Sequence, residues 1–399
     1  MKRKTGTYER IIVGDEEVAA FLPAPLPPRH PALDLSGALE DRLIAAEQAL
    51  RRLELAGAMV PSIDWFLYAF VRKEAVITSQ IEGTQSTLLD LLRFESEEGA
   101  EAGADLEEVC NYLRALDWAR SRISDRKGLP LSVRLLNETH ARLMQGVRGA
   151  DKHPGEVRRS QSWIGGSRPG NAVFVPPPPH ALPDLLAGFE KAMHAKQGHP
   201  ALIRAGLLHV QFESIHPYLD GNGRIGRLLI TLLLEHWKLL SQPLLYLSLF
   251  FKRHQAEYYR RLGAVRTEGD WEGWLDFFLD GVATIADEAV TDSRELSALV
   301  IRDRGRVISA AAASVQTIRL FESLPRHPLV SVGSAMRLLQ TTKPTAGRAI
   351  DALVEAGVLV ETTGRQRGRW FAYQKYLERL RAGTDLDPMP SARRRPRGR

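Results

Sequence analysis

Apolar residues recur every three or four positions along most of this chain, a spacing that places them on one face of an α-helix. The pattern predicts amphipathic helices over residues 39–55, 63–77, 88–94, 106–122, 132–143, 182–196, 202–215, 258–261 and 271–285. Residues 228–239 are apolar on almost every side, so we expect that helix to be buried. The pattern as a whole predicts a mainly α-helical protein.

Two segments interrupt the helical pattern. Residues 1–35 are rich in turn formers, and the prolines at positions 23, 25, 27 and 28 favour an extended chain there. Residues 157–179 contain Gly165-Gly166 and Gly170-Asn171, followed by a short apolar stretch that ends in consecutive prolines. This second arrangement predicts a short β-hairpin.

The pattern changes again near residue 329. Residues 332–339 and 344–356 predict two helices joined by a turn, and the second helix ends at Gly357. Residues 358–362 and 369–373 then predict two strands joined by a basic loop. A helix, a turn, a second helix and a basic hairpin follow one another in a winged helix-turn-helix, which we therefore expect at the C-terminus.

A length of 399 residues indicates more than one domain. We expect an N-terminal helical region over residues 1–105, a catalytic core over 106–295, the winged helix over 300–378 and a disordered basic tail over 379–399. A single cysteine, Cys110, excludes an internal disulfide and a cysteine-cluster zinc site. The charged N-terminus lacks the apolar core of a signal peptide, and no apolar run approaches a membrane-spanning length. These features predict a cytoplasmic protein without a membrane segment.

The net charge of +6 is unevenly distributed. The last 21 residues hold seven arginines against two aspartates, and residues 301–378 hold twelve Lys and Arg against six Asp and Glu. A block of one sign indicates a polyanionic partner such as DNA, or a solvated tail. The recognition helix would present Thr341, Thr342, Lys343, Thr345 and Arg348, and the wing would present Arg365, Arg367 and Arg369. The alternative is a winged helix used only for dimerisation or for docking a target.

The strongest chemical signal is the catalytic loop, residues 216–227, which reads His-Pro-Tyr-Leu-Asp-Gly-Asn-Gly-Arg-Ile-Gly-Arg. Its glycines allow close approach of a ligand to backbone N–H groups at the start of the next helix, where anions bind well. Arg224 and Arg227 suit phosphate oxygens, and Asp220 suits Mg²⁺. His216 titrates near neutrality and is the natural general base. Together these residues predict attack by a hydroxyl on a phosphorus atom.

The same loop resembles the Fic family motif H-x-F-x-[D/E]-G-N-G-R-x-x-R at seven of its eight specified positions; Tyr218 replaces the phenylalanine. The resemblance implies a Fic-type helical core in which residues 157–179 form a flap that aligns the target by strand addition. It also implies transfer of AMP from ATP to a Ser, Thr or Tyr hydroxyl, with His216 as the base and Asp220 as the Mg²⁺ ligand. The residues that would contact the nucleotide are Gly221, Asn222, Gly223, Arg224, Ile225, Gly226 and Arg227. Tyr258 and Tyr259 are either walls of the adenine site or core residues.

A second family motif, [S/T]-x-x-x-E-[G/N], is matched by residues 78–83, Thr-Ser-Gln-Ile-Glu-Gly, which we call the inhibitory motif. The resemblance implies that Glu82 pairs with Arg227 and so occupies the charge meant for the γ-phosphate. The expected function is a self-restrained protein AMP-transferase that modifies a target protein or itself. Two alternatives remain open: a DNA-binding transcription regulator whose Fic part only senses nucleotide, and an enzyme that removes AMP or transfers another group. The family resemblance also allows a homodimer.

Overall fold

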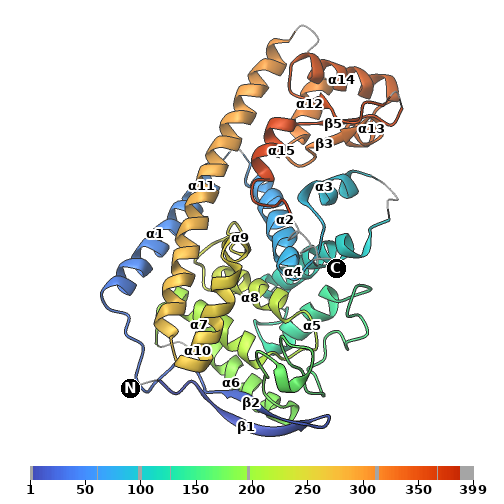
Figure 1. The fold of residues 1–399 in the computed structure, drawn as a ribbon. Helices are drawn as coiled ribbons and strands as arrows, with labels where there is room; N and C mark the ends of the chain where they lie inside the picture. Colours follow the sequence, from blue (N-terminus) through green and yellow to red (C-terminus); the bar gives the residue numbers. More distant parts are fainter. Residues whose placement is uncertain are drawn as a thin grey trace, which may run out of the picture.

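The computed structural model describes residues 3–60, 62–97, 101–125, 127–195, 198–310, 314–365 and 367–386. The expectation of a mainly α-helical protein is confirmed: helices make up most of the described chain, and the strands are short (Figure 1). The helices of the N-terminal and central parts are α1 (Ala38–Met59), α2 (Ile63–Ile81), α3 (Leu88–Ser96), α4 (Ala104–Ser124), α5 (Val133–Leu143), α6 (Leu182–His194), α7 (Ala201–Ile215), α8 (Asn222–His236), α9 (Ser248–Arg253) and α10 (Gln255–Glu268). Helix α8 begins six residues before the apolar run that predicted it.

The longest helix, α11 (Trp271–Ser309), extends along the whole molecule, with α1 packed against it (Figure 1). Its lower half packs on the central helices, and its upper half reaches the C-terminal elements. The domain boundary expected between residues 295 and 300 therefore falls inside a continuous helix. Leu296, Val300 and Val307 are all buried, so apolar contacts continue across the expected boundary and keep the helix intact.

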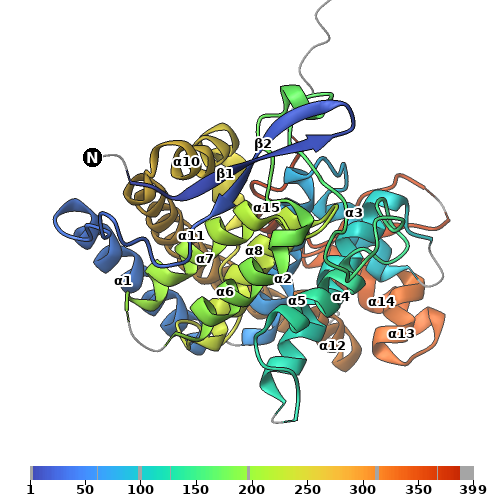
Figure 2. The ribbon, with the colours of Figure 1, turned by 90° about the horizontal axis from the view of Figure 1, so that it is seen from below.

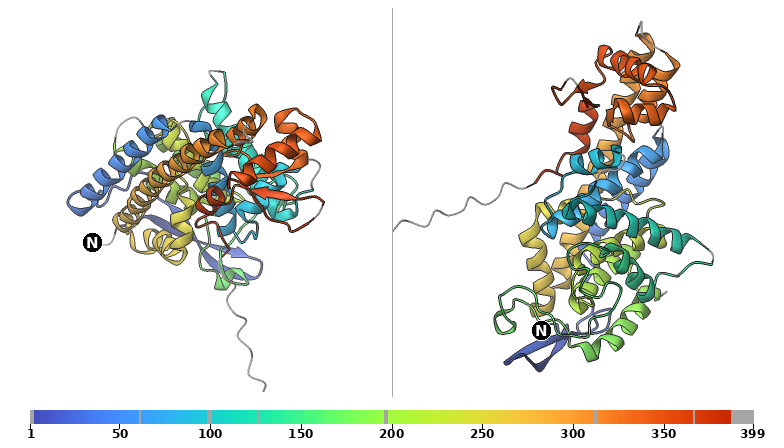
Figure 3. Two further views of the ribbon diagram at one scale, coloured as in Figure 1. Left: turned by 90° about the horizontal axis from the view of Figure 1, so that it is seen from above. Right: turned by 90° about the vertical axis from the view of Figure 1, so that its right-hand side faces the viewer.

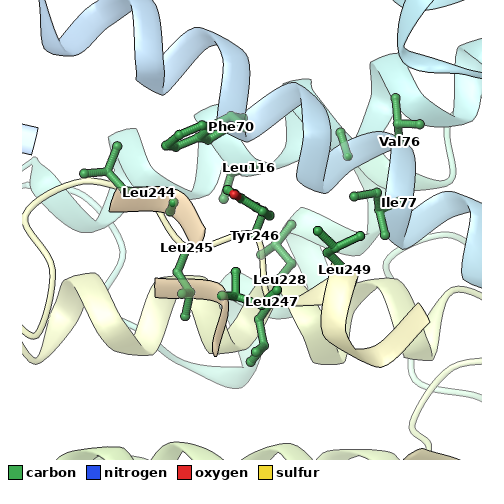
Figure 4. Close-up of a cluster of buried hydrophobic side chains, with 14 of the residues drawn as sticks. Phe70, Val76, Ile77, Leu116, Leu228, Leu244, Leu245, Tyr246, Leu247 and Leu249 are labelled. Carbon is green, nitrogen blue, oxygen red and sulfur yellow. The ribbon is translucent and has the colours of Figure 1, made fainter. Parts of the chain in front are cut away.

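The core lies between α2, α4, α7, α8 and α11. Figure 4 shows one part of it, in which Phe70 and Ile77 of α2 face Tyr246, just before α9, and Leu249 of α9. Each of these side chains is at most 2 % exposed. At about 25 cal/mol per Å² of apolar surface, burial of such side chains supplies the main stabilisation of the arrangement. The same packing fixes the end of α2, which carries the inhibitory motif.

The N-terminus contains a hairpin that the sequence pattern did not reveal. Strands β1 (Gly6–Val13) and β2 (Glu16–Pro23) pair antiparallel, so residues 1–105 are not purely helical as expected. Val18, Ala20 and Phe21 are buried, and the backbone N–H of Phe21 donates to the carbonyl of Val175 at 2.9 Å. Figure 2 shows the hairpin lying alongside the loop of residues 157–179. The alternation of apolar and polar residues that would predict a strand is weak here, because both faces of β1 are largely open to solvent.

The flap, residues 157–179, is a hairpin-like loop with little regular pairing. One antiparallel bridge joins Ile164 and Phe174, and a 3₁₀ turn (η1, Pro169–Asn171) lies between them. A second 3₁₀ turn, η2 (Pro179–Ala181), leads into α6. The glycines at positions 165 and 166 have φ of +68° and +74°, a conformation that favours glycine. The hairpin prediction is thus correct in outline, and one backbone hydrogen bond, from Phe21 N–H to Val175 O, joins the flap to β2.

The C-terminal elements follow in the order α12 (Val315–Ser323), β3 (Leu329–Ser331), α13 (Val332–Leu339), α14 (Lys343–Glu355), β4 (Val360–Glu361), β5 (Trp370–Ala372) and α15 (Gln374–Leu380). The three strands form one antiparallel sheet in the order β3-β5-β4. A winged helix-turn-helix has this order of helices and strands, although its assignment here remains a prediction. Figure 3 shows these elements gathered at one end of α11.

The basic tail was expected to begin at residue 379, but the chain is ordered beyond that point. Helix α15 continues to Leu380, which is 2 % exposed, and Thr384 is completely buried. Apolar contacts of α15 with α11 explain the difference. The remainder of the expected tail, residues 387–399, lies outside the described residues. None of the helices in the described part of the chain combines the length and apolar character that a membrane span requires.

Candidate active site

The catalytic loop connects two buried helices that pack on each other, α7 and α8. Helix α7 ends at His216, whose φ of +49° turns the chain sharply, and Gly221 has φ of +78° just before α8 begins. Between them, the side chain of Asn222 accepts from the N–H of Tyr218 at 2.9 Å and donates to its carbonyl at 2.8 Å. The oxygen and the nitrogen of the Asn222 amide are therefore both bonded to the loop backbone. The expected contact of Asn222 with phosphate would have to come from its backbone N–H.

Tyr218, the one departure from the motif, is accommodated without a lost hydrogen bond. Its ring is 1 % exposed and stacks on His140 with a centroid distance of 3.9 Å. Its hydroxyl donates to Asn137 Oδ1 at 2.8 Å, which satisfies the buried polar group. His140 Nε2 in turn donates to the carbonyl of Asp220 at 2.9 Å. The tyrosine thus links α5 to the loop that carries Asp220.

His216 is held so that its imidazole is neutral at pH 7. Burial and, to a smaller extent, the neighbouring Arg158 guanidinium lower the pKa of its ring to about 3. Arg158 also fixes the backbone: its Nε donates to the His216 carbonyl at 2.9 Å, and its N–H donates to Pro217 O at 2.9 Å. A neutral imidazole can accept a proton, which is the state that a general base requires.

Arg158 reaches both arms of the flap as well. Its guanidinium donates to the carbonyls of Ser160 and Pro177, at 3.2 and 2.6 Å. It is 3 % exposed and has no carboxylate partner among the described residues, and burial lowers the pKa of its guanidinium to about 10. One side chain therefore fastens the flap to the catalytic loop. The sequence offered no signal for it, since an isolated arginine in a loop normally faces solvent.

Asp220 sits at the entrance of the site and is suited to a divalent cation. Its Oδ1 accepts from the N–H of Gly221 at 2.6 Å, and Arg224 lies 3.7 Å from the same oxygen. The side chain is 39 % exposed, so it can reach a ligand. Mg²⁺ in phosphoryl-transfer sites commonly takes one or two carboxylates and completes its shell with phosphates and water. The described residues contain no cluster of three or more metal-binding side chains.

Arg227 and Glu82 form the ion pair that the sequence predicted. Glu82 lies at the C-terminal end of α2, and its Oε1 accepts from Arg227 Nη2 at 2.6 Å. Thr78 of the same motif accepts from Arg227 Nε through its hydroxyl at 2.7 Å and from Nη2 through its carbonyl at 3.1 Å. Although burial opposes its charge, the Arg227 guanidinium holds the pKa of Glu82 below its ordinary value. Thr78 and Glu82 of the inhibitory motif thus both bind the Arg227 guanidinium.

The Glu82 carboxylate also covers the N-terminus of α8. A Cβ placed on Gly223 would lie 2.2 Å from Glu82 Oε1 and 3.0 Å from an Arg227 nitrogen. Gly223 is in the first turn of α8, where backbone N–H groups and the helix dipole attract anions. The carboxylate therefore occupies the place that these N–H groups would offer to a phosphate.

Arg224 is held in a buried ion pair, and its expected contact with phosphate stays a prediction. Its guanidinium is 1 % exposed, and it donates from Nη1 to Glu108 Oε2 of α4 at 3.0 Å and from Nη2 to Met144 Sδ at 3.4 Å. Glu108 is itself 1 % exposed and also lies 3.6 Å from Arg148. In this structure Arg224 is thus committed to a buried pair beneath the loop. Glu108, which the sequence analysis did not single out, is the residue that holds it there.

Three other expected nucleotide contacts face away from the site. Ile225 is completely buried in the core, and Gly226 packs on Glu213 of α7, because α8 begins at Asn222 and its second turn points toward α7. Tyr258 is 1 % exposed, and its hydroxyl donates to His209 Nε2 at 2.8 Å. The helical pattern could not distinguish these inward positions from the outward ones. The side chains of Ile225 and Tyr258 therefore offer no surface to a nucleotide in this structure, and contact of the three residues with it stays a prediction.

Tyr259, by contrast, borders a cavity of about 550 Å³. The cavity lies between β2, the second arm of the flap and α10, and its walls include Tyr8, Phe174 and Arg266. Arg266 stacks on the ring of Phe174, with its guanidinium carbon 3.9 Å from the ring centroid. Aromatic and cationic walls suit a planar, negatively charged ligand, but no residue of the catalytic loop lines this cavity, so a role of Tyr259 in the adenine site stays a prediction.

Comparisons with known proteins agree with this geometry. Residues 40–121 match the model described as Fic/DOC family N-terminal, and residues 130–234 match the model described as Fic/DOC family. The chain belongs to the Fic/DOC family. Its Fic domain thus contains the catalytic loop, and its Fic N-terminal domain contains the inhibitory motif.

Several known proteins resemble this Fic protein. A protein named protein adenylyltransferase Fic, from Aedes aegypti, is 30 % identical over 223 residues, which cover 54 % of this chain and 41 % of that protein. The chain therefore spans well under half the length of that relative. A crystal structure of a Fic family protein from Desulfovibrio desulfuricans G20 covers 85 % of this chain and 97 % of its own, with a TM-score of 0.56 at 20 % identity. A Fic domain containing signaling protein from Bacteroides thetaiotaomicron covers 63 % of this chain and 97 % of its own, with a TM-score of 0.51 at 18 % identity. These two structures share the fold.

Proposed function

We propose that this Fic protein transfers AMP from ATP to a Ser, Thr or Tyr hydroxyl of a target protein or of itself, and that Glu82 restrains the transfer. The observation that carries the proposal is the Glu82–Arg227 pair at 2.6 Å over the N-terminus of α8. A carboxylate in an anion site, held by the arginine of the Fic motif, marks the place where a triphosphate would bind. The relative named protein adenylyltransferase Fic supports the same reaction.

The proposed reaction forms one bond and breaks another at the α-phosphorus. The target hydroxyl oxygen attacks that phosphorus while its proton passes to His216, and the bond to the β-phosphate oxygen breaks, so that pyrophosphate leaves. A Mg²⁺ ion held by Asp220 would neutralise charge on the phosphates. The chain itself positions the base through Arg158 and offers backbone N–H groups of α8 to the phosphates. Negative charge on the bound phosphates would raise the pKa of His216 from its low value and make it a stronger base.

The restraint has a simple electrostatic basis. Two opposite charges about 4 Å apart attract by about 4 kcal/mol at an effective dielectric of about 20, before any desolvation cost. Regulation between two sites typically needs a coupling of about 1–3 kcal/mol. The Glu82–Arg227 pair is therefore strong enough to keep the γ-phosphate of ATP away from Arg227.

Labelling with α-³²P nucleotides tests the proposal. We expect Glu82→Gly to incorporate at least about tenfold more label from ATP than the unmodified chain, and Glu82→Gly combined with His216→Ala to incorporate none. Parallel reactions with GTP, CTP and UTP identify the nucleotide. No incorporation by Glu82→Gly, together with no ATP binding by calorimetry, would falsify the enzyme assignment. Release of AMP from a labelled protein by the unmodified chain, lost in Glu82→Gly, would instead support the removal of AMP.

We also propose that the C-terminal elements bind duplex DNA. Lys343 and Arg348, at the start of α14, are exposed, as are Arg365, Arg367 and Arg369 in the loop between β4 and β5. Basic side chains on a helix start and an adjacent hairpin match the way a winged helix contacts phosphates and a groove. Duplex binding by the full chain should weaken steeply with salt, and Lys343→Ala with Arg348→Ala should reduce both affinity and the salt slope. Arg134→Ala on the exposed face of α5 is the matched control. Equal binding by all three proteins would leave dimerisation or target docking as the role of these elements.

A further inference from the structure

The chain folds back onto the catalytic part after its last helix. Beyond α15, Gly383 adopts φ of +80°, and a Cβ there would lie 2.8 Å from Leu249 Cδ1 of α9. The next residue, Thr384, is completely buried, and its N–H and hydroxyl both donate to the Arg381 carbonyl at 2.8 Å. Residues 381–386 thus form a compact turn seated against α9. We call this turn the C-terminal latch.

The latch is attached to the inhibitory motif by hydrogen bonds. Gln80 Nε2 donates to the Thr384 carbonyl at 2.9 Å and to the Ser86 carbonyl at 3.0 Å. Lys252 Nζ donates to the Asp385 carbonyl at 2.7 Å and to Gln80 Oε1 at 2.9 Å. Gln80 is therefore bonded at both ends of its amide, and two of these four bonds end on latch carbonyls.

Gln80 belongs to the turn that presents Glu82. The carbonyl of Gln80 accepts from the Gly83 N–H at 3.0 Å, and the carbonyl of Ser79 accepts from the N–H groups of Glu82 and Thr84 at 3.0 and 3.2 Å. These bonds end α2 and direct the Glu82 side chain toward Arg227. A contact that fixes Gln80 from outside the turn therefore also helps to fix the position of the Glu82 carboxylate.

Other C-terminal contacts also fall on α2 and its immediate neighbours. Arg326 pairs with Asp64 at the start of α2 at 2.7 Å, and the ring of His327 lies 6.4 Å from that of Tyr68. At the level of α15, Asp292 of α11 lies 3.6 Å from the buried Lys73 of α2 and 3.4 Å from Arg379. Figure 1 shows α15 near one end of α2. The C-terminal elements thus contact α2 near its start and at its end, and they reach its middle through Asp292 of α11.

We propose that the surface formed by Gln80, Leu249 and Lys252 is a docking site for the chain's own residues 381–386, and that this docking holds Glu82 on Arg227. The inference rests on the proposed AMP transfer and adds an internal control of its restraint. When the latch is seated, the end of α2 is fixed and Glu82 covers the N-terminus of α8. When it is released, Gln80 in the turn of residues 79–84 loses its bond to Thr384, Lys252 loses its bond to Asp385, and the Glu82–Arg227 pair is weakened. Anything that binds the C-terminal elements and moves α15 then acts on the catalytic loop.

Two variants test the latch in different ways. Gln80→Leu, in the full-length chain, removes the bonds to Thr384 and to Lys252, and truncation after Leu380 removes the latch while leaving the Gln80–Ser86 bond. Each should raise incorporation of label from α-³²P ATP about tenfold, which corresponds to about 1.4 kcal/mol. Truncation after Leu386 is the matched control, because it retains Thr384 and Asp385, and it should behave as the unmodified chain. Melting temperatures within a few degrees of the unmodified chain confirm that each variant is folded.

The Glu82→Gly variant separates failure of the latch from failure of the proposed function. If Glu82→Gly labels strongly while Gln80→Leu and truncation after Leu380 label as the unmodified chain does, the latch proposal is wrong and the AMP transfer stands. If Glu82→Gly itself does not label, the AMP transfer fails and the latch loses its basis. Adding either latch change to Glu82→Gly should give less than about a twofold further increase. A large further increase, or an equal increase on truncation after Leu386, would overturn the latch.

Discussion

Charged side chains that are almost completely buried surround the catalytic loop. Arg224, Arg227 and Glu108 are each at most 3 % exposed, and Glu213 of α7 is buried as well. Buried charges are expensive unless they are paired, and such groups concentrate where proteins carry out chemistry. Glu213 is the exception to pairing, because its Oε1 has no hydrogen-bond partner among the described residues. Burial raises the pKa of its carboxyl to about 7.

The raised pKa of Glu213 predicts a loss of stability as pH rises. The folded chain binds this proton up to about pH 7, whereas the unfolded chain releases it near its ordinary value of 4.5, so stability falls between these two values. Glu213→Gln, which stays neutral, should be more stable than the unmodified chain at pH 8, by about 1–3 kcal/mol, and by much less at pH 4.5. Urea unfolding at the two pH values measures the difference. Glu355→Gln, on an exposed position of α14, is the control, and an equal effect there would contradict the explanation.

Arg158 should affect the base without touching the nucleotide. Arg158→Met removes its side-chain hydrogen bonds to the backbone of the loop and the flap. In the Glu82→Gly background we expect the labelling rate to fall about a hundredfold, while the Kd for ATP measured by calorimetry changes less than about threefold. The pH profile of the rate should also shift, because His216 loses a neighbouring positive charge that lowers its pKa. Arg159→Met, one position along and largely exposed, is the matched control. A fall in ATP affinity equal to the fall in rate would show that Arg158 serves binding instead.

At the scale of elements, the start of α8 determines what the site can bind. Helix α8 begins within the catalytic loop, and its first turn, at Gly223, lies against the Glu82–Arg227 pair. The flap and the β1–β2 hairpin close the opposite side, joined by the bond from Phe21 N–H to Val175 O. Helix α2 meets α8 from a third direction and brings Glu82. The site is therefore assembled from helix ends, where backbone groups remain available for a ligand.

A substitution at Gly223 directly tests the role of the first turn of α8. In Gly223→Ala the new Cβ would lie 2.2 Å from Glu82 Oε1, so the carboxylate must move. The methyl group would also block the N–H groups of the first turn, so we expect no ATP binding by calorimetry even in the Glu82→Gly background. Gly347→Ala in α14, where a Cβ would meet no atom within 4 Å, should leave ATP binding unchanged and the fold equal or slightly more stable. ATP binding retained by Gly223→Ala with Glu82→Gly would show that phosphates bind elsewhere.

At the scale of the molecule, α11 joins the Fic domain to the C-terminal elements as one rigid helix. It packs along α1 and α7 in its first half and on α12 and α15 in its second. Asp303, 1 % exposed, accepts from the Tyr373 hydroxyl at 2.9 Å and lies 3.2 Å from both Arg302 and Arg306. A continuous helix transmits a displacement of one end to the other more directly than a flexible linker does. The latch and α11 together give the C-terminal elements two connections to the site.

Limited proteolysis should reveal this continuity. If residues 295–300 formed a flexible linker, trypsin would cut after Arg294 or Arg302 under native conditions and release a C-terminal fragment. Because both residues lie within α11, we expect neither cut until the chain is unfolded by urea. Mass spectrometry of the fragments over time identifies the sites. Rapid native cleavage at either arginine would contradict a continuous helix.

The sequence by itself determined the helices and the chemistry of the catalytic loop. Apolar spacing records which face of a helix is buried, and that local signal placed α1, α2, α4, α5 and α7 within a few residues of their observed bounds. The twelve residues of the loop are contiguous, so their motif could be recognised without knowledge of the fold. The inhibitory motif was found for the same reason, and the pairing of Glu82 with Arg227 followed from the resemblance.

Only the tertiary structure decided which of these residues face the site and what holds them there. Spacing along a helix gives a face but not the neighbour that covers it, so Tyr258 and Ile225 could not be distinguished from ligand contacts before packing was known. The attachment of Gln80 to Thr384 joins positions about three hundred residues apart. Arg158 acts through hydrogen bonds to backbone carbonyls such as that of His216, and Glu108 acts through its ion pair with Arg224. Both partners are distant in the sequence. Such contacts depend on how helices pack in space, and a local pattern contains no record of that packing.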